Sequence, residues 1–187
     1  MARARANLAP AMDAPLRARA GAIALLALDV DGVLTDGTIY YGAEGEVVKA
    51  FNIMDGLGVR LLERAGIRTA IISARESPPL RRRAVDLGIE LTYFGRHDKV
   101  AAWETLLART GIAAAHAAFV GDDLIDLGVL ARAGLAVAVS NAHPAVCEQA
   151  HYVTVCPGGK GAVREIAELL LAARGALDGV IQEYAAG

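Results

Sequence analysis

Two pairs of carboxylates follow apolar runs in this sequence, and their residue types suit phosphoryl transfer. Asp29 and Asp31 stand directly after the first apolar run, and Asp122 and Asp123 follow another. A carboxylate can attack phosphorus when a cation offsets its repulsion from the phosphate, and a second carboxyl can protonate the leaving group and then activate water. Mg²⁺ prefers oxygen ligands and keeps several waters. We therefore expect Asp29, Asp122 and a backbone carbonyl to hold Mg²⁺, with Asp123 ligating through water or orienting a neighbour.

The alternative is that these acids only cap turns. This interpretation fits Asp36 best. Asp126 could likewise be a helix-surface or capping residue. The interpretation fits Asp29 and Asp31 poorly, because a buried strand that ends in paired acids is costly unless a cation lies nearby. Gly32 allows a tight turn whose backbone N–H groups face the pocket, which suits an anion.

Two further side chains could bind a phosphate group. Ser73 ends an apolar run and offers a hydroxyl, although alone it would be no better than a turn serine. Lys99 follows the helix-capping residue Asp98, and alone it would be read as a solvated surface lysine. Phosphoryl transfer needs fixed positive charge on the transferred group. A lysine after the third strand, as Lys99 is expected to be, is well placed to supply that charge.

Apolar runs that alternate with helical patterns must position these residues. The pattern predicts an α/β fold, a Rossmann-like parallel sheet with helices on both faces and ligands at the carboxyl ends of the strands. A β-hairpin with a Gly-containing turn interrupts the alternation at residues 38–51. The other strands are expected at residues 22–30, 68–73, 91–94, 118–120, 135–139 and 152–155. Helices are expected at residues 55–65, 79–87, 98–110, 124–133, 144–150 and 162–174, with the glycines of residues 158–161 as a flexible hinge before the last.

Composition limits the class of protein. The 187 residues suit one domain, and the net charge of −2 gives no global attraction to nucleic acid or an anionic membrane. No apolar run approaches the roughly 18 residues of a membrane span. Cys147 and Cys156 form no CxxC motif, which favours a reducing, cytoplasmic location. We expect a poorly ordered extension over residues 1–15, a single domain over 16–175 and a tail over 176–187; a transit-type leader is the alternative for the Ala- and Arg-rich residues 1–20.

Taken in order, these residues resemble the haloacid dehalogenase-like hydrolase superfamily. DVDG resembles its first motif, Ser73 the second, Lys99 the third and GDDLID the fourth. The resemblance implies that Asp29 is the nucleophile and Asp31 the general acid/base. It further implies that Ser73 and Lys99 bind phosphate, and that Mg²⁺ is held by Asp29, the carbonyl of Asp31, and Asp122, with Asp123 close by.

A narrower resemblance is to the family of 3-deoxy-D-manno-octulosonate 8-phosphate phosphatases, from about Leu16 to the end of the chain. The matching segments are DVDGVLTDG, the hairpin, FNIMDGLGVRLL, GDDLID, NAHP and GGKGAVREI. That family acts on a phosphorylated acidic sugar in lipopolysaccharide precursor synthesis, forms homotetramers and lacks a cap domain. The resemblance implies that a neighbouring subunit completes the site. The substrate-binding candidates are Arg75, Asp55, Gly56, Lys160 and Arg164, of which Arg75 suits a sugar carboxylate.

Two departures put the substrate in question. Where the family has Thr-Gly-Arg, this chain has Ser73-Ala74-Arg75, and where it often has Gln-Gly, this chain has Phe94-Gly95. A phosphatase of a sialic-type nine-carbon sugar 9-phosphate therefore stays open, as does a catalytically silent binding module of the same fold. Instead of binding substrate, Lys160 and Arg164 could be solvent-exposed residues beside a glycine hinge.

Overall fold

A six-stranded parallel sheet forms the centre of the molecule in the computed structural model, which describes residues 12–186. The strand order is β5-β4-β1-β6-β7-β8, and every pairing in this sheet is parallel. All four residues of β1 are buried, which explains its unbroken apolar sequence. The strands are β1 (Leu25–Leu28), β4 (Arg68–Ile72), β5 (Leu91–Tyr93), β6 (Ala117–Gly121), β7 (Leu135–Ala138) and β8 (Tyr152–Val153).

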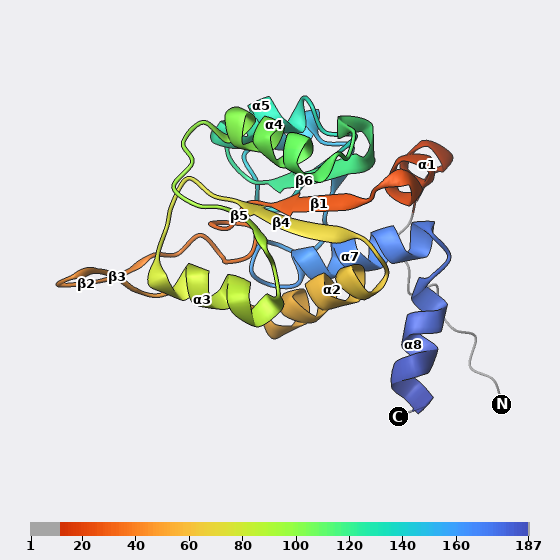
Figure 1. The fold of residues 1–187 in the computed structure, drawn as a ribbon, viewed down its shortest axis with the longest axis horizontal. Coiled ribbons are helices and arrows are strands. Elements are labelled where there is room, and N and C mark those ends of the chain that lie inside the picture. The colour runs from red at the N-terminus through yellow and green to blue at the C-terminus, as the bar shows by residue number, and fades with distance from the viewer. Residues whose placement is uncertain (1–11, 187) are drawn as a thin grey trace.

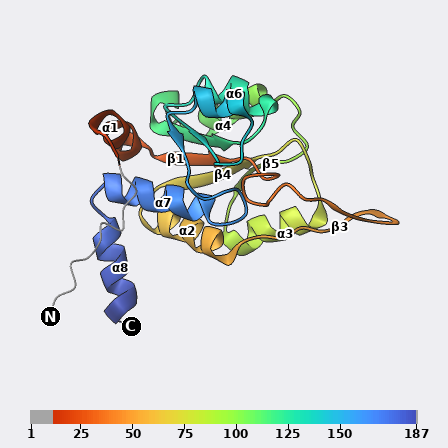
Figure 2. The ribbon, with the colours of Figure 1, turned by 180° about the vertical axis from the view of Figure 1, so that it is seen from behind.

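Helices cover both faces of this sheet, as the alternating pattern predicts. Figures 1 and 2 show α4, α5 and α6 on one face and α2, α3 and α7 on the other, each over its own apolar cluster. The helices are α1 (Ala14–Ala22), α2 (Ile53–Arg64), α3 (Pro78–Leu87), α4 (Lys99–Thr110), α5 (Leu127–Leu130), α6 (Pro144–Gln149), α7 (Ala162–Ala173) and α8 (Leu177–Ala186), with 3₁₀ turns at Ala114–His116 and Leu124–Asp126. None of them, within residues 12–186, has the length and apolar character that crossing a membrane requires.

A two-stranded hairpin projects from this body. Strands β2 (Tyr40–Gly42) and β3 (Gly45–Val48) pair antiparallel and extend away from the helices in both views (Figures 1 and 2). Between β1 and β4 the chain forms only this hairpin and α2, so no cap domain is inserted there. The hairpin exposes apolar surface, because Tyr41 is 67% and Val48 is 53% exposed.

The beginning of the described chain differs from expectation. The apolar pattern suggested a strand from residue 22 after an irregular terminus, but residues Ala14–Ala22 form α1, and β1 starts only at Leu25. Asp13 caps this helix by accepting a hydrogen bond from the backbone N–H of Leu16 at 2.8 Å, and Ala20 is fully buried. Residues 1–11 lie outside the described part of the chain. In the expected C-terminal tail the chain forms α8, while the expected domain limits stay predictions.

The glycine segment at residues 158–161 is not the flexible hinge that its composition suggested. Gly159 donates its N–H to the carbonyl of Val33 at 2.8 Å, so the segment lies directly on the loop that follows β1. A Cβ added at Gly158 would overlap the carbonyl oxygen of Gly32. Close backbone approach explains Gly158 and Gly159, and a φ of +107° explains Gly161. The hinge prediction was wrong because composition alone cannot distinguish mobility from tight packing.

Candidate active site for phosphoryl transfer

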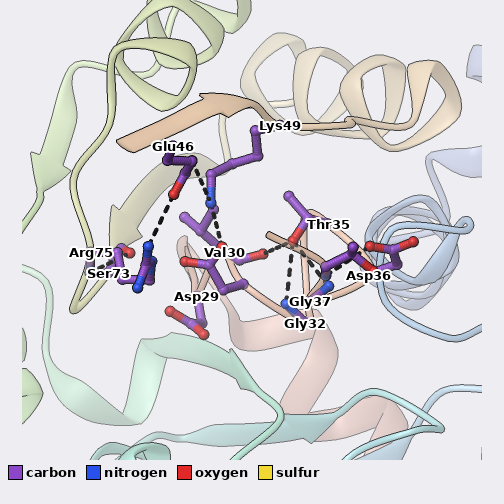
Figure 3. Close-up of polar contacts among 12 residues, drawn as sticks. Asp29, Val30, Gly32, Thr35, Asp36, Gly37, Glu46, Lys49, Ser73 and Arg75 are labelled. Atoms are coloured by element: carbon purple, nitrogen blue, oxygen red, sulfur yellow. Dashed lines mark hydrogen bonds and ion pairs between the residues drawn. The ribbon is translucent and has the colours of Figure 1, made fainter. Parts of the chain in front are cut away.

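The carboxyl ends of three neighbouring strands bring the predicted residues to one edge of the sheet. Asp29 follows β1, Ser73 follows β4 and Asp122 follows β6, while Lys99 begins α4. Strand β1 lies between β4 and β6, so Asp29 occupies the centre of this edge. Figure 3 shows Ser73 and Arg75 on one side of Asp29 and the loop of residues 30–37 on the other.

Lys99 forms the buried cationic centre of the site. Its Nζ lies 2.8 Å from Oδ1 of Asp29 and 2.6 Å from Oδ1 of Asp126, and all three side chains are almost fully buried. Burial raises the pKa of Asp29 to about 6, with Lys99 opposing the rise and Asp126 adding to it. Burial acts to lower the pKa of Lys99, but the two carboxylates raise it above its ordinary value. Lys99 therefore stays charged and fixes the orientation of Asp29.

Asp126 belongs to this cluster more closely than Asp123 does. Asp126 is fully buried, and its Oδ2 accepts hydrogen bonds from the backbone N–H groups of Asp122 at 3.0 Å and Asp123 at 3.3 Å. Asp123 is exposed, and its Oδ1 accepts from the backbone N–H of Leu124 at 2.7 Å. Asp126 thus shapes the loop and neutralises Lys99. Its burial excludes the helix-surface position that the sequence left open for it. The role of Asp123 near the metal stays a prediction.

Three carboxylates at this edge fit a divalent cation. Oxygen atoms of Asp29, Asp122 and Asp126 all lie within 4.8 Å of one another. Burial, followed by the charges of Asp29 and Asp126, raises the pKa of Asp122 to about 8. Lys99 is the cation paired with the cluster in residues 12–186, so the carboxylates lack full compensation. Because Asp126 already accepts hydrogen bonds with both oxygens, Asp29 and Asp122 are the side chains with capacity for a hard cation such as Mg²⁺.

The loop after β1 is the tight turn that Gly32 was expected to allow, but the N–H groups of Gly32 and Gly37 donate within the loop and do not face an anion. Gly32 has a φ of +97°, and a Cβ there would overlap the carboxylate of Asp122. Thr35 closes the turn, since its Oγ1 accepts from the N–H groups of Gly32 at 3.4 Å and Gly37 at 3.2 Å (Figure 3). Asp36 is exposed and accepts from the N–H of Thr38, as expected for a residue that only caps a turn.

Lys49 is a charged residue of the site that the sequence did not reveal. It follows β3 of the hairpin, and its buried Nζ forms an ion pair with Oδ1 of Asp31 and another, at 3.3 Å, with Glu46 (Figure 3). Oε2 of Glu46 accepts from Nη2 of Arg75 at 3.2 Å. No local pattern marks Lys49, because its place depends on how the hairpin base folds against the loop after β1.

The predicted substrate-binding residues fall into two groups. Arg75 lies beside Ser73 at the phosphoryl-transfer edge, where its guanidinium contacts the hairpin. Asp55 is buried and caps α7 by accepting from the backbone N–H of Arg164 at 2.9 Å. Gly56 packs against Arg83, Lys160 is exposed, and the guanidinium of Arg164 pairs with Glu168 at 2.6 Å. Substrate contacts by these residues stay predictions.

The departure at Ala74 leaves the backbone undisturbed. Among residues 12–186 no residue other than glycine has a positive φ, so Ala74 occupies a conformation that any L-residue adopts. Ser73 is buried, and its Oγ accepts from the N–H of Arg75 at 3.1 Å. The replacement of glycine therefore leaves the turn after β4 unstrained.

This fold and this site define the class of the protein. The family model of the haloacid dehalogenase-like hydrolases matches residues 88–166. Asp29, Ser73 and Asp122 follow strands of one parallel sheet and Lys99 begins α4, in the chain order of the four motifs that the sequence resembles. The molecule is a haloacid dehalogenase-like hydrolase, and residues 12–186 contain no cap domain.

Relatives over almost the whole length narrow the class. The chain is 47% identical over 181 residues to 3-deoxy-D-manno-octulosonate 8-phosphate phosphatase of Escherichia coli strain K12, covering 95% of this chain and 96% of the relative. A crystal structure of that phosphatase from Yersinia pestis has a TM-score of 0.87 and 48% identity, with 89% and 90% of the two chains covered. The structure from Moraxella catarrhalis, in complex with a magnesium ion, a phosphate ion and a KDO molecule, has a TM-score of 0.88 and 41% identity, with 90% and 97% covered. The chain belongs to the family of 3-deoxy-D-manno-octulosonate 8-phosphate phosphatases.

Proposed function

We propose that this chain hydrolyses 3-deoxy-D-manno-octulosonate 8-phosphate to 3-deoxy-D-manno-octulosonate and inorganic phosphate, with Mg²⁺ as cofactor, as a step in lipopolysaccharide precursor synthesis. The observation that carries the proposal is the buried contact of Lys99 with Asp29, at 2.8 Å, in the middle of a carboxylate cluster. Relatives at 47% identity support the substrate, and the Moraxella catarrhalis structure supports both the metal and the sugar.

Two steps on this chain's own residues give the reaction. In the first, a carboxylate oxygen of Asp29 attacks phosphorus, the bond from phosphorus to the sugar oxygen breaks, and the leaving oxygen takes a proton from Asp31. In the second, water attacks the aspartyl phosphate, its proton passes to Asp31, and the bond to Asp29 breaks. Lys99 and Ser73 position the phosphoryl oxygens. Mg²⁺ bound through Asp29, the carbonyl of Asp31, and Asp122 would supply charge neutralisation for the transferred group.

Phosphate release from the octulosonate 8-phosphate, with and without Mg²⁺, tests this function directly. Asp29→Asn removes the nucleophile and should abolish turnover. Asp36→Asn is the matched control on the same loop, because an asparagine oxygen can still accept the hydrogen bond from Thr38. A panel of sugar phosphates, including a sialic-type nine-carbon 9-phosphate, should run alongside.

Each outcome has a definite reading. Mg²⁺-dependent release that prefers the octulosonate and disappears in Asp29→Asn supports the whole proposal. Preference for the nine-carbon 9-phosphate would keep the chemistry and replace the substrate. Absence of turnover with every sugar phosphate would overturn the enzymatic function in favour of a silent binding module.

The proposal includes a homotetramer in which a neighbouring subunit completes the site. The exposed apolar residues of the hairpin support it, because Tyr40, Tyr41, Val47 and Val48 are 47%, 67%, 54% and 53% exposed, and a free hairpin is marginal in water. No inserted cap covers the phosphoryl-transfer edge, so another covering is needed to exclude water.

Sedimentation analysis of Val48→Lys tests the assembly. The charged side chain should dissociate the tetramer and reduce turnover of the octulosonate phosphate. Val85→Lys, on the outer face of α3 at 75% exposure, is the matched control and should leave both unchanged. A native monomer with full activity would overturn the assembly and leave the chemistry intact.

A cytoplasmic location, expected from the cysteine pattern, remains part of the proposal.

A further inference from the structure

Lys49 brings a second buried cation to the site, from the hairpin. Its side chain is only 2% exposed, and its Nζ forms an ion pair with Oδ1 of Asp31. The two proposed steps do not use this lysine, because Lys99 neutralises the nucleophile. A buried ammonium is costly unless its charge is compensated and its geometry fixed. Its contact with the proposed acid–base group therefore requires a physical explanation.

Lys49 is itself held in place from a second side. Glu46, with a side chain 7% exposed, pairs with Lys49 at 3.3 Å and with Arg75 at 3.2 Å through its other oxygen. Arg75 also donates to the hydroxyl of Tyr41 at 3.2 Å. Figure 3 shows Glu46 between Arg75 and Lys49, with both ion pairs marked by dashed lines. The ammonium of Lys49 is thus held between the carboxylates of Asp31 and Glu46.

We propose that Lys49 is a positioning residue that orients the carboxyl group of Asp31 for proton transfer. By holding Oδ1, it directs Oδ2 toward the oxygen that leaves phosphorus, and later toward the attacking water. The hydrogen bonds found in residues 12–186 involve Oδ1 of Asp31 and leave Oδ2 available. The inference rests on the proposed phosphatase function. It adds a link between the hairpin base and the chemical steps.

A lysine that acts through Asp31 predicts a dependence on the leaving group. A sugar oxygen must take a proton as it leaves phosphorus, whereas p-nitrophenolate is stable without one. A lysine that contacted the phosphate directly, or only supported the fold, would affect both leaving groups alike. Rapid-quench measurement of leaving-group release in a single turnover separates these cases, because it isolates the first step from aspartyl-phosphate hydrolysis.

The experiment compares Lys49→Met with native protein on the octulosonate 8-phosphate and on p-nitrophenyl phosphate, with Mg²⁺ present. We expect sugar release to slow by about tenfold or more and p-nitrophenol release by less than about threefold, since general acid–base catalysis typically contributes at least 10²-fold. Arg82→Met is the control, because Arg82 is 80% exposed on α3. Equal slowing of both substrates, or slowing of neither, would overturn the proposal.

A double-mutant cycle removes ambiguity from misfolding. In an Asp31→Asn background, Lys49→Met should change sugar release by less than about threefold, because the group through which it acts is gone. Lys49→Arg should restore part of the lost rate. Additive losses in the double variant would refute positioning through Asp31. If native protein cleaves another alkyl sugar phosphate but not the octulosonate 8-phosphate, the proposed substrate is wrong. The same comparison on that ester then tests the role of Lys49. Turnover of no phosphate monoester at all would overturn both proposals.

Discussion

Replacement of Lys99 by methionine should destabilise the metal-free protein in a pH-dependent manner. Lys99 contacts Asp29 and Asp126 at 2.8 and 2.6 Å, and its removal leaves two buried carboxylates without their cation. Loss of one partner from a buried ion pair typically costs about 3–5 kcal/mol. For a protein of this length that corresponds to a fall in Tm of about 6–20 °C.

The pH dependence follows from Asp29. Its folded-state pKa is about 6, above its ordinary value of 3.8, so this carboxyl reduces stability above pH 6 and not below pH 3.8. Without Lys99 that pKa rises further, and the added cost appears as the pH increases. We therefore expect the loss at pH 8 to exceed the loss at pH 5 by at least about 1 kcal/mol, the free energy of roughly one pKa unit.

Urea unfolding in the presence of EDTA at pH 5 and pH 8 measures both losses. Lys160→Met is the control, because it makes the same substitution at an exposed lysine. Adding Asp126→Asn to Lys99→Met should recover part of the stability at pH 8, since one uncompensated charge is removed. A loss below about 1 kcal/mol, the range of an exposed ion pair, or an equal loss at both pH values would refute the electrostatic account of the Lys99 cluster.

Three further predictions concern the metal and the loop after β1. Because burial and neighbouring charges raise the pKa of Asp122 to about 8, Mg²⁺ should bind more weakly at pH 6 than at pH 8.5 and should release protons, which calorimetry in two buffers of different ionisation enthalpy would detect. Gly32→Ala should weaken Mg²⁺ binding by about tenfold or more, because its Cβ would overlap the carboxylate of Asp122, and changes to residues that support a metal ligand typically cost 10–100-fold in metal affinity. Gly45→Ala is the control, because it carries similar backbone strain at a φ of +111° but has no atom within 4 Å of the added Cβ. Mg²⁺ binding should be unchanged in Gly45→Ala. Gly158→Ala should cost about 1–3 kcal/mol in urea unfolding because the new methyl group overlaps the loop backbone, and native-like stability would contradict the close packing.

The strand ends of the site were predictable because their signals are local. An apolar run that stops at an acid or a hydroxyl residue places Asp29, Ser73 and Asp122 without knowledge of the rest of the fold. The cap at Asp98 and the left-handed glycine at Gly111 likewise fix α4, and with it the start at Lys99.

The parts that the sequence did not predict depend on tertiary contacts. Asp123 and Asp126 are both acids of one short segment, and only the turn of the backbone there directs Asp126 inward. Lys49 reaches Asp31 because the base of the hairpin folds over the loop after β1. Helix α1 is rich in alanine and only weakly patterned, and packing on α7 supports it. For Lys49 and α1 the decisive neighbour is far away in the sequence, whereas the turn that directs Asp126 inward is local.

The close packing of Gly158 and Gly159 on the loop after β1 bears on how the protein matures during synthesis. Asp29 and the turn after it leave the ribosome early, but the backbone that supports the turn belongs to the last part of the chain. Contacts of such high sequence separation form late, after the intervening strands have paired. A nascent chain that ends before Gly158 carries Asp29 without the support of its loop. We therefore expect that a chain ending before Gly158 lacks phosphatase activity, because the support of this loop is made last.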